Sequence, residues 1–356
     1  MLSRTAVLAL ICSLASLWFA LSVATAAHIQ AHPAADPSIS ELMAQVQSAT
    51  LMSYANQLTG ETPATIGGQP YTFTTRETTS GTPITKATQF AYEFMQARGL
   101  DVRYANWSAC GIANRNVIAE KIGADLPGEV VLVTAHLDST SDTNAAPGAD
   151  DDASGVAGVL AIAEILAPHT FQRTLQFVLF TGEEQGLCGS EVFARQAAAN
   201  DLNIVAVYNL DMIAYDSDSE PILRLHTRTR RDSGYAADAA IANTFIDVVA
   251  NYGLSGKLTP LILADGLDES DTYSFWDWDF PGVLAIEDDG PTSDDFNPYY
   301  HSSADRVRAN NETYFTNFVK ASVGTAATLA GVAVTATPTP APTLGPYRLH
   351  LPSIRQ

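Results

Sequence analysis

Short apolar runs alternate along this chain with longer stretches whose apolar residues recur every three or four positions. The short runs predict buried strands, whereas the longer periodic stretches predict helices that pack by one face. Within residues 153–166, for example, Val156, Val159, Leu160 and Leu166 share one helical face. We expect strands at residues 116–121, 129–134, 175–180, 204–210, 222–226, 258–263 and 283–287, and helices at residues 40–58, 84–98, 153–166, 187–198, 236–252 and 311–333.

The order of these elements predicts the fold class. Strands that alternate with helices form mostly parallel sheets, because each helix carries the chain back to begin the next strand in the same direction. Parallel strands are covered on both faces, which explains why their apolar runs are nearly continuous. The sequence therefore predicts an α/β fold with a mixed, mostly parallel central sheet and helices on both faces. We assign residues 38–334 to a single domain of this kind.

Residues 1–26 have a different pattern from the rest of the chain. They carry one charge, Arg4, followed by an apolar stretch over residues 6–23 and a few small residues. This pattern is typical of a secretory signal peptide with its cleavage site. The alternative is an uncleaved membrane anchor, because the apolar stretch approaches the length that spans a bilayer. We expect cleavage, which would leave a short segment at residues 27–37 and a secreted or extracellular protein without a membrane span.

The C-terminal end is also unlike the domain. Residues 335–346 are rich in proline and threonine, which predicts an extended linker without a core. Residues 347–356 follow as a tail with a short apolar patch. A surface-attachment signal and a disordered stub are the two interpretations of this tail.

Acidic residues outnumber basic ones. The full chain has 39 Asp and Glu against 19 Lys and Arg, and Arg4 is the only charge in the expected signal peptide, so the mature balance is 18 − 39 = −21. Such a charge argues against nucleic acids and anionic membranes as partners. Part of it lies in clusters of carboxylates, where bound cations would offset it.

Two of the three cysteines remain after signal cleavage. Cys12 leaves with the signal peptide, and Cys110 and Cys188 stay in the mature chain. A pair of cysteines in an exported protein favours one disulfide. The alternative is two buried reduced thiols, because the sequence does not give the distance between them.

Side chains that bind metals follow several of the predicted strands. In open α/β sheets ligands bind outside the carboxyl ends of the strands, so these side chains should converge on one crevice. Imidazole and carboxylate ligands without a thiolate suit zinc or a similar divalent ion, with cobalt and manganese as alternatives. The candidates are His136, Asp138, Asp150, Asp151, Asp152, Glu183, Glu184, Asp211 and His301.

Each candidate group has an ordinary explanation when taken alone. His136 beside Asp138 can be a surface pair, although His136 can also bind a metal while Asp138 accepts its other ring N–H. Aspartates at the start of a helix can cap it, but three in a row exceed what a cap needs. The adjacent Glu183 and Glu184 point apart, so one can bind a metal while the other faces a bound water. Occurring together in this order, the groups indicate a metallohydrolase.

The motifs resemble those of the co-catalytic zinc aminopeptidases, a family that includes secreted bacterial leucyl aminopeptidases. The resemblance covers roughly residues 38–333 and implies the zinc-exopeptidase fold with two zinc ions per chain. It rests on His136-Leu137-Asp138, Pro147-Gly148-Ala149-Asp150-Asp151-Asp152-Ala153-Ser154-Gly155, Glu183-Glu184-Gln185-Gly186-Leu187, Leu210-Asp211-Met212 and Asn297-Pro298-Tyr299-Tyr300-His301.

The resemblance also implies a role for each site residue. Asp151 would bridge the two zinc ions, and the peptide bond that follows it would be cis. His136 and Asp211 would complete one zinc site, and Glu184 and His301 the other. Glu183 would be the general base, and Asp138 the partner of His136.

Two further features bear on catalysis and substrate choice. Tyr300 can donate a hydrogen bond to the tetrahedral oxyanion, and the alternative is a packing aromatic in the pocket wall. Some relatives carry a Cys-x-x-x-Cys loop close to the pocket where this chain has Asp-Gly-Leu-Asp-Glu at residues 265–269. These acids leave the substrate preference open, although Met212 and Phe296 favour an apolar pocket.

We therefore expect a secreted, monomeric metallo-aminopeptidase that hydrolyses large apolar N-terminal residues from peptides through a water activated by two zinc ions. A glutaminyl cyclase or another zinc hydrolase of the same fold is the alternative within enzymes. The alternative from a different class is a secreted binding protein that kept the fold and lost the chemistry. An inactive relative would be expected to lose a ligand or the base, and this chain has every one of them.

Overall fold

The computed structural model describes residues 35–289, 293 and 295–332. The expected signal peptide, the proline-rich linker and the C-terminal tail lie outside these residues. Within the described part of the chain, no helix combines the length and the apolar character that a membrane crossing needs.

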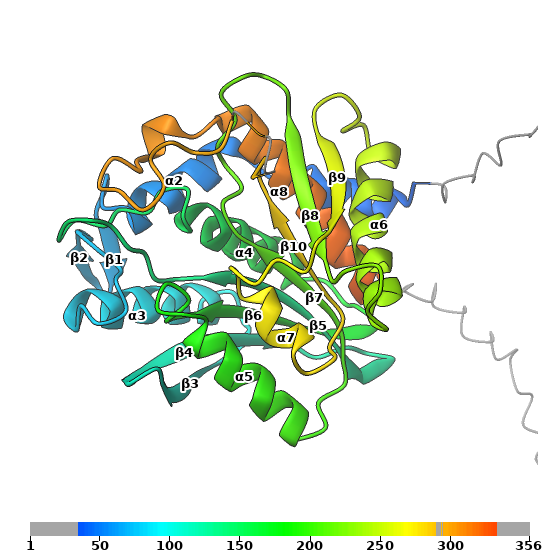
Figure 1. Cartoon of the computed structure of the whole chain (residues 1–356), viewed down its shortest axis with the longest axis horizontal. Coiled ribbons are helices and arrows are strands. Elements are labelled where there is room, and N and C mark those ends of the chain that lie inside the picture. The colour runs from blue at the N-terminus through cyan, green and yellow to red at the C-terminus, as the bar shows by residue number, and fades with distance from the viewer. Residues whose placement is uncertain (1–34, 290–292, 294, 333–356) are drawn as a thin grey trace, which may run out of the picture. The chain divides into compact units, whose positions relative to one another are not determined.

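An eight-stranded sheet forms the centre of the domain (Figure 1). Its order is β3-β4-β6-β5-β7-β10-β8-β9, and the four central strands β6, β5, β7 and β10 run parallel. Strand β4 runs antiparallel to both β3 and β6, β8 runs antiparallel to β10, and β9 is parallel to β8. The strands are β3 (Asp101–Ala109), β4 (Ile112–Lys121), β5 (Leu126–His136), β6 (Arg173–Phe180), β7 (Ile204–Leu210), β8 (Ile222–Thr227), β9 (Thr259–Ala264) and β10 (Gly282–Ile286).

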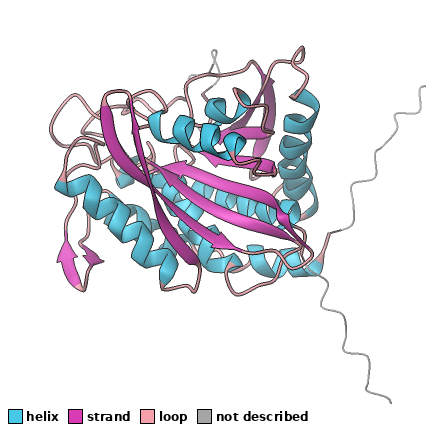
Figure 2. Cartoon of the chain, turned by 90° about the horizontal axis from the view of Figure 1, so that it is seen from below, coloured by secondary structure: helices cyan, strands magenta, loops and turns pink. Residues whose placement is uncertain are grey.

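Helices cover both faces of this sheet (Figure 2). Helices α3, α4, α6 and α8 pack on one face, with α1 and α2 against them, and α5 and α7 pack on the other. The fold is therefore the mixed α/β sheet with two helical layers that the sequence predicts. The helices are α1 (Pro37–Met43), α2 (Ser48–Leu58), α3 (Thr82–Gln96), α4 (Ala153–Leu166), α5 (Cys188–Ala199), α6 (Tyr235–Asn251), α7 (Thr272–Trp276) and α8 (Glu312–Ala330).

Alternation along the strands divides the apolar core into two layers. Val131 and Val133 of β5 belong to the larger cluster, which includes the helices on the α4 and α8 side. The neighbouring Val130 and Leu132 face the other way and belong to the cluster that contains Phe275 of α7. Successive strand side chains point to opposite faces, so one apolar run supplies both layers.

Several elements differ from the prediction. The single helix expected at residues 40–58 is two helices, because Gln47 is extended between them and Val46 is buried in the core at the break. Strand β3 was not expected, because its alternating burial leaves it with little continuous apolar character. The short helix α7 was also missed, and the loop before α3 contains a small hairpin of β1 (Ala64–Ile66) and β2 (Gln69–Tyr71).

Candidate metal centre

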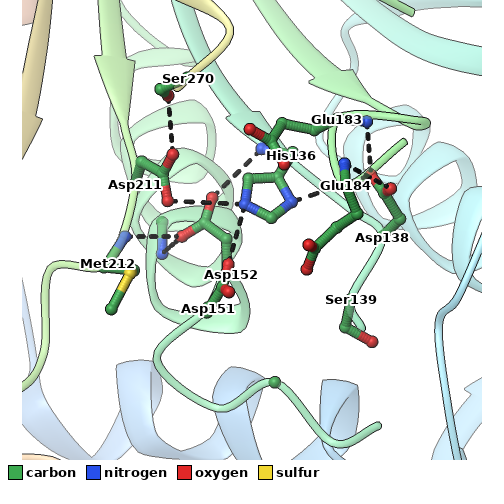
Figure 3. Close-up of polar contacts among 12 residues, drawn as sticks. His136, Asp138, Ser139, Asp151, Asp152, Glu183, Glu184, Asp211, Met212 and Ser270 are labelled. Carbon is green, nitrogen blue, oxygen red and sulfur yellow. Dashed lines mark hydrogen bonds and ion pairs between the residues drawn. The ribbon is translucent and has the colours of Figure 1, made fainter. Parts of the chain in front are cut away.

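The carboxyl ends of three adjacent parallel strands bring the candidate ligands together (Figure 3). His136 is the last residue of β5, and Asp211 comes directly after β7. Glu183 and Glu184 follow β6 after a two-residue turn. Because β6, β5 and β7 are neighbours and run in the same direction, all three ends meet at one edge of the sheet.

Asp151 lies at the centre of this group. Its Oδ1 is 3.1 Å from Nε2 of His136, and its Oδ2 is 3.2 Å from Nε2 of His301. Asp211 Oδ1 lies 3.5 Å from the same nitrogen of His136, and Glu184 Oε2 lies 3.0 Å from that of His301. Each oxygen of Asp151 therefore faces a different histidine, and each histidine has a second carboxylate beside it.

These five residues fit two divalent cations. His136, Asp151 and Asp211 offer ligand atoms that all lie within 4.8 Å of one another, and so do Asp151, Glu184 and His301. Imidazole nitrogens and carboxylate oxygens are common zinc ligands, and no cysteine is among them. Asp151 belongs to both sets, so the two cation positions would share it as a bridge.

The pKa shifts of the carboxyl groups in the site also favour bound cations. Burial raises the pKa of Glu184 to about 7, and the nearby Asp151 adds to this effect. Burial likewise raises the pKa of Glu183 well above its ordinary value, and Asp211 and Asp271 raise it further. Burial opposes ionisation of Asp151 as well, but hydrogen bonds from His136 and His301 lower its pKa overall. Cations between these groups would relieve the repulsion among the carboxylates.

Asp138 holds the turn that carries the two glutamates. Its carboxylate accepts from the backbone N–H groups of Glu183 and Glu184, at 3.4 Å in each case, and from the hydroxyl of Thr78 at 2.8 Å. Its distance to Nδ1 of His136 is 3.8 Å, which is longer than a hydrogen bond. The expected contact of Asp138 with the ring N–H of His136 is therefore close but not formed, and Nδ1 has no hydrogen-bond partner within the described residues.

The other two aspartates of the triplet have structural partners. Asp152 caps helix α4 by accepting from the N–H of Gly155. Asp150 accepts from the backbone N–H of Ala214 and from the side-chain amide of Asn297. Asp150 thus fixes the segment that leads to His301. The peptide bond between Asp151 and Asp152 is cis, as the resemblance implies.

Tyr300 and His301 come from an irregular segment after β10. Their rings are stacked with centroids 3.6 Å apart, and Phe296 meets Tyr300 edge to face. Burial raises the pKa of the Tyr300 hydroxyl, and the carboxylates of Asp151 and Asp211 raise it further. The hydroxyl is therefore protonated at neutral pH. Tyr300 lines the same pocket as four of the five ligands, as do Glu183 and Met212.

Sequence reasoning missed several residues that position the ligands. Ser270 donates to Oδ2 of Asp211 at 2.7 Å and accepts from the amide of Asn209. Asp305 accepts from the backbone N–H of Asp151, and its pKa is raised to about 7 by burial. Arg76 is fully buried and donates to four backbone carbonyls, among them those of Leu137 and Gly148. A serine, an aspartate or an arginine in a loop is common, so the sequence carries no signal for these roles.

Cys110 and Cys188 form a disulfide. The bond joins the turn between β3 and β4 to the first residue of α5, close behind the turn that carries Glu183 and Glu184. This is the pairing that the sequence favours over two reduced thiols.

Curated proteins similar to this chain match it over a limited segment. A "probable leucine aminopeptidase 2" from Aspergillus oryzae is 35% identical over 133 residues, covering 37% of this chain and 26% of that protein. A "probable zinc metalloprotease" from Pyrenophora teres f. teres is 38% identical over 114 residues, covering 30% of this chain and 24% of that protein. The match thus spans about a quarter of the length of each relative.

Solved structures share the fold over most of the chain. LapB from Legionella pneumophila superposes with a TM-score of 0.67 at 22% identity, covering 84% of this chain and 76% of that one. A glutaminyl cyclase from Bacteroides thetaiotaomicron has a TM-score of 0.60 at 15% identity, covering 79% of this chain and 97% of that one. At these identities the likeness concerns the fold alone.

The part of the chain that matches a known protein family includes the strands and loops that hold the candidate ligands. Residues 116–325 match the model of peptidase family M28, which is more than half of the chain and runs from β4 into α8. All eight proposed metal and catalytic residues lie within this range. The chain therefore belongs to peptidase family M28.

Proposed function

We propose that this protein is a zinc-dependent aminopeptidase that removes residues one at a time from the N-terminus of peptides. The observation that carries this proposal is the position of Asp151, which offers one oxygen to each of two sets of ligands. Membership of peptidase family M28 and the likeness to a probable leucine aminopeptidase support it.

His136, Asp151 and Asp211 would hold one zinc ion, and Asp151, Glu184 and His301 the other. When bound, two adjacent cations lower the pKa of a water molecule and polarise a carbonyl oxygen. Ser270 holds the carboxylate of Asp211, and Asp305 holds the backbone of Asp151, so these two ligands are positioned by their neighbours.

Glu183 is the proposed general base. Its side chain lies in the pocket beside the ligands without belonging to either ligand set. A carboxylate in this position can take a proton from the attacking water and pass it to the leaving amine. Asp138 would fix its position through the backbone of residues 183 and 184.

Tyr300 is the proposed donor to the oxyanion. It is placed in the wall of the same pocket, and its raised pKa keeps the hydroxyl protonated as a donor. Stacking on His301 ties the orientation of Tyr300 to that of a ligand. A donor aimed at the charge that develops in the transition state stabilises it more than it stabilises the substrate.

The pocket beside the ligands would take the side chain of the N-terminal residue. Met212, Leu284 and Ile286 form an apolar cluster there, which supports a substrate residue with a large apolar surface. The expected signal peptide supports a secreted protein, and the balance of charge supports peptides rather than nucleic acids as partners.

The test is digestion of a peptide that begins with leucine, with its N-terminus free or acetylated, followed by mass spectrometry. We expect stepwise loss of N-terminal residues from the free peptide and none from the acetylated one, because an acetylated amine cannot bind as a free amine. Removal of C-terminal residues or internal cleavage would contradict the proposal. A peptide that begins with glutamine tests the cyclase alternative, which predicts loss of ammonia without loss of a residue.

A further inference from the structure

Two carboxylates outside the proposed ligand sets line the pocket beside the proposed metal centre. Besides the ligands and Glu183, the described residues that line this pocket include two acids, Glu269 and Asp289. Glu269 belongs to the loop between β9 and α7, and Asp289 follows β10. Neither acid belongs to a group of metal-ligand side chains.

Apolar side chains also line this pocket. Leu284 and Ile286 of β10 point the same way, and they pack with Met212 and the partly buried Leu267. Phe296 lines the pocket as well. A substrate side chain in this pocket would therefore meet aliphatic and aromatic groups as well as these two carboxylates.

The negative charge of Asp289 is only partly balanced. Its Oδ1 lies 3.0 Å from Nε2 of His226, whose Nδ1 lies 3.0 Å from Asp265. One protonated imidazole thus serves two carboxylates, which leaves this trio with one net negative charge. The arginine of β8, Arg224, is paired with Asp288 at 2.6 Å.

Glu269 has no basic partner within the described residues. Glu269 is exposed to solvent and lines the pocket. The next residue, Ser270, is hydrogen-bonded to Asp211, so the backbone that carries Glu269 is held against a proposed zinc ligand. No lysine or arginine is among the described residues that line the pocket.

We propose that the pocket selects peptides whose N-terminal residue is lysine or arginine. The aliphatic stem of such a residue would pack on Leu284, Ile286 and Met212, and its cationic end would meet Glu269 and Asp289. N-terminal glutamate or aspartate would be repelled. This inference rests on the proposed aminopeptidase function and names its substrate class.

The test compares p-nitroanilides of lysine and norleucine, which have similar stems and differ in the terminal ammonium. We expect kcat/KM for lysine to exceed that for norleucine by about tenfold, with glutamate slowest. Glu269→Gln should lower the lysine-to-norleucine ratio about threefold, because it removes one of the two charges and keeps the shape. Asp268→Asn is the matched control: Asp268 is an exposed neighbouring acid outside the pocket lining, so the ratio should not change.

Two results would overturn the inference. A wild-type preference for norleucine would show that the apolar wall alone decides. An equal loss for both substrates in Glu269→Gln would mean that the carboxylate binds the α-amine instead. Calorimetric binding of free lysine and norleucine gives the same comparison without turnover. Failure of the aminopeptidase proposal would therefore appear as absent cleavage, and failure of the charge preference as equal binding.

Discussion

Glu183 lies beside the proposed metal ligands, but its proposed role is that of general base. It lies in the same pocket and next to Glu184 in sequence, yet it belongs to neither set of ligand atoms. Replacing Glu183 by glutamine keeps the size of the side chain and removes its ability to accept a proton. We expect kcat to fall by about 10²–10⁴ while zinc content stays unchanged, measured with an anilide substrate and by elemental analysis.

The matched control for this variant is Glu191→Gln. Glu191 lies on α5, is about half exposed and pairs with Arg195 on the helix surface. Its loss should leave kcat unchanged. If Glu183→Gln turns over at the wild-type rate, Glu183 is not the base.

Tyr300 has two interpretations that kinetics can separate. Tyr300→Phe keeps the stack on His301 and the edge contact with Phe296 but removes the hydroxyl. If the hydroxyl stabilises the oxyanion, kcat should fall by about 10²–10³ with little change in KM. A kcat within twofold of the wild type would assign Tyr300 to the pocket wall alone.

The types of ligand could be predicted from the sequence, but not which aspartate does what. Asp150, Asp151 and Asp152 are chemically identical and adjacent, so pattern alone cannot rank them. Their roles depend on the direction in which the backbone points each of the three side chains. Asp150 meets Asn297, Asp151 faces both histidines, and Asp152 caps α4. Only the resemblance to a known family pointed to Asp151 as the bridge.

At the scale of elements, strands with continuous apolar runs were the easiest to predict. Strand β7 and helix α4 have the predicted bounds, because their burial follows directly from their apolar residues. Edge strand β3 was missed, because it alternates exposed and buried residues and contains polar positions. The break between α1 and α2 was missed because it depends on where Val46 packs, which is a tertiary effect.

His226 on β8 joins two neighbouring segments of the sheet edge. It bridges Asp265 after β9 and Asp289 after β10, with both distances at 3.0 Å. Burial by itself would lower the pKa of His226, but these two carboxylates raise it to about 9, above the ordinary value of 6.5. The folded protein therefore holds this proton more tightly than the unfolded chain does.

The resulting stabilisation is fully present below pH 6.5 and is lost as the pH rises through about 9. It amounts to at most about 3 kcal/mol. We expect His226→Gln to lower the free energy of unfolding clearly at pH 6 and much less at pH 10, measured by urea denaturation. His169→Gln, at an exposed loop position, is the control and should change neither value. An equal loss at both pH values would contradict the charge-based explanation.

For the whole molecule, the sequence was sufficient for the fold class and for the edge of the sheet where the site lies. The carboxyl-end rule for parallel strands brings residues from β5, β6 and β7 to one place without any knowledge of side-chain geometry. This rule does not predict which loop residues line the rest of the pocket. The resemblance indicated that the loop containing Glu269 lies close to the pocket, whereas nothing in the sequence indicated that Asp289 lines it too.

The most direct test of the proposed metal centre is zinc per chain on the purified protein, measured together with cleavage of an aminoacyl p-nitroanilide before and after chelation. Two sites that share Asp151 predict close to two zinc ions per chain. Activity should be lost on chelation and regained when zinc is restored. One zinc per chain without anilide cleavage would favour a single-metal enzyme such as a cyclase, and no zinc after zinc is added would contradict the metal centre itself.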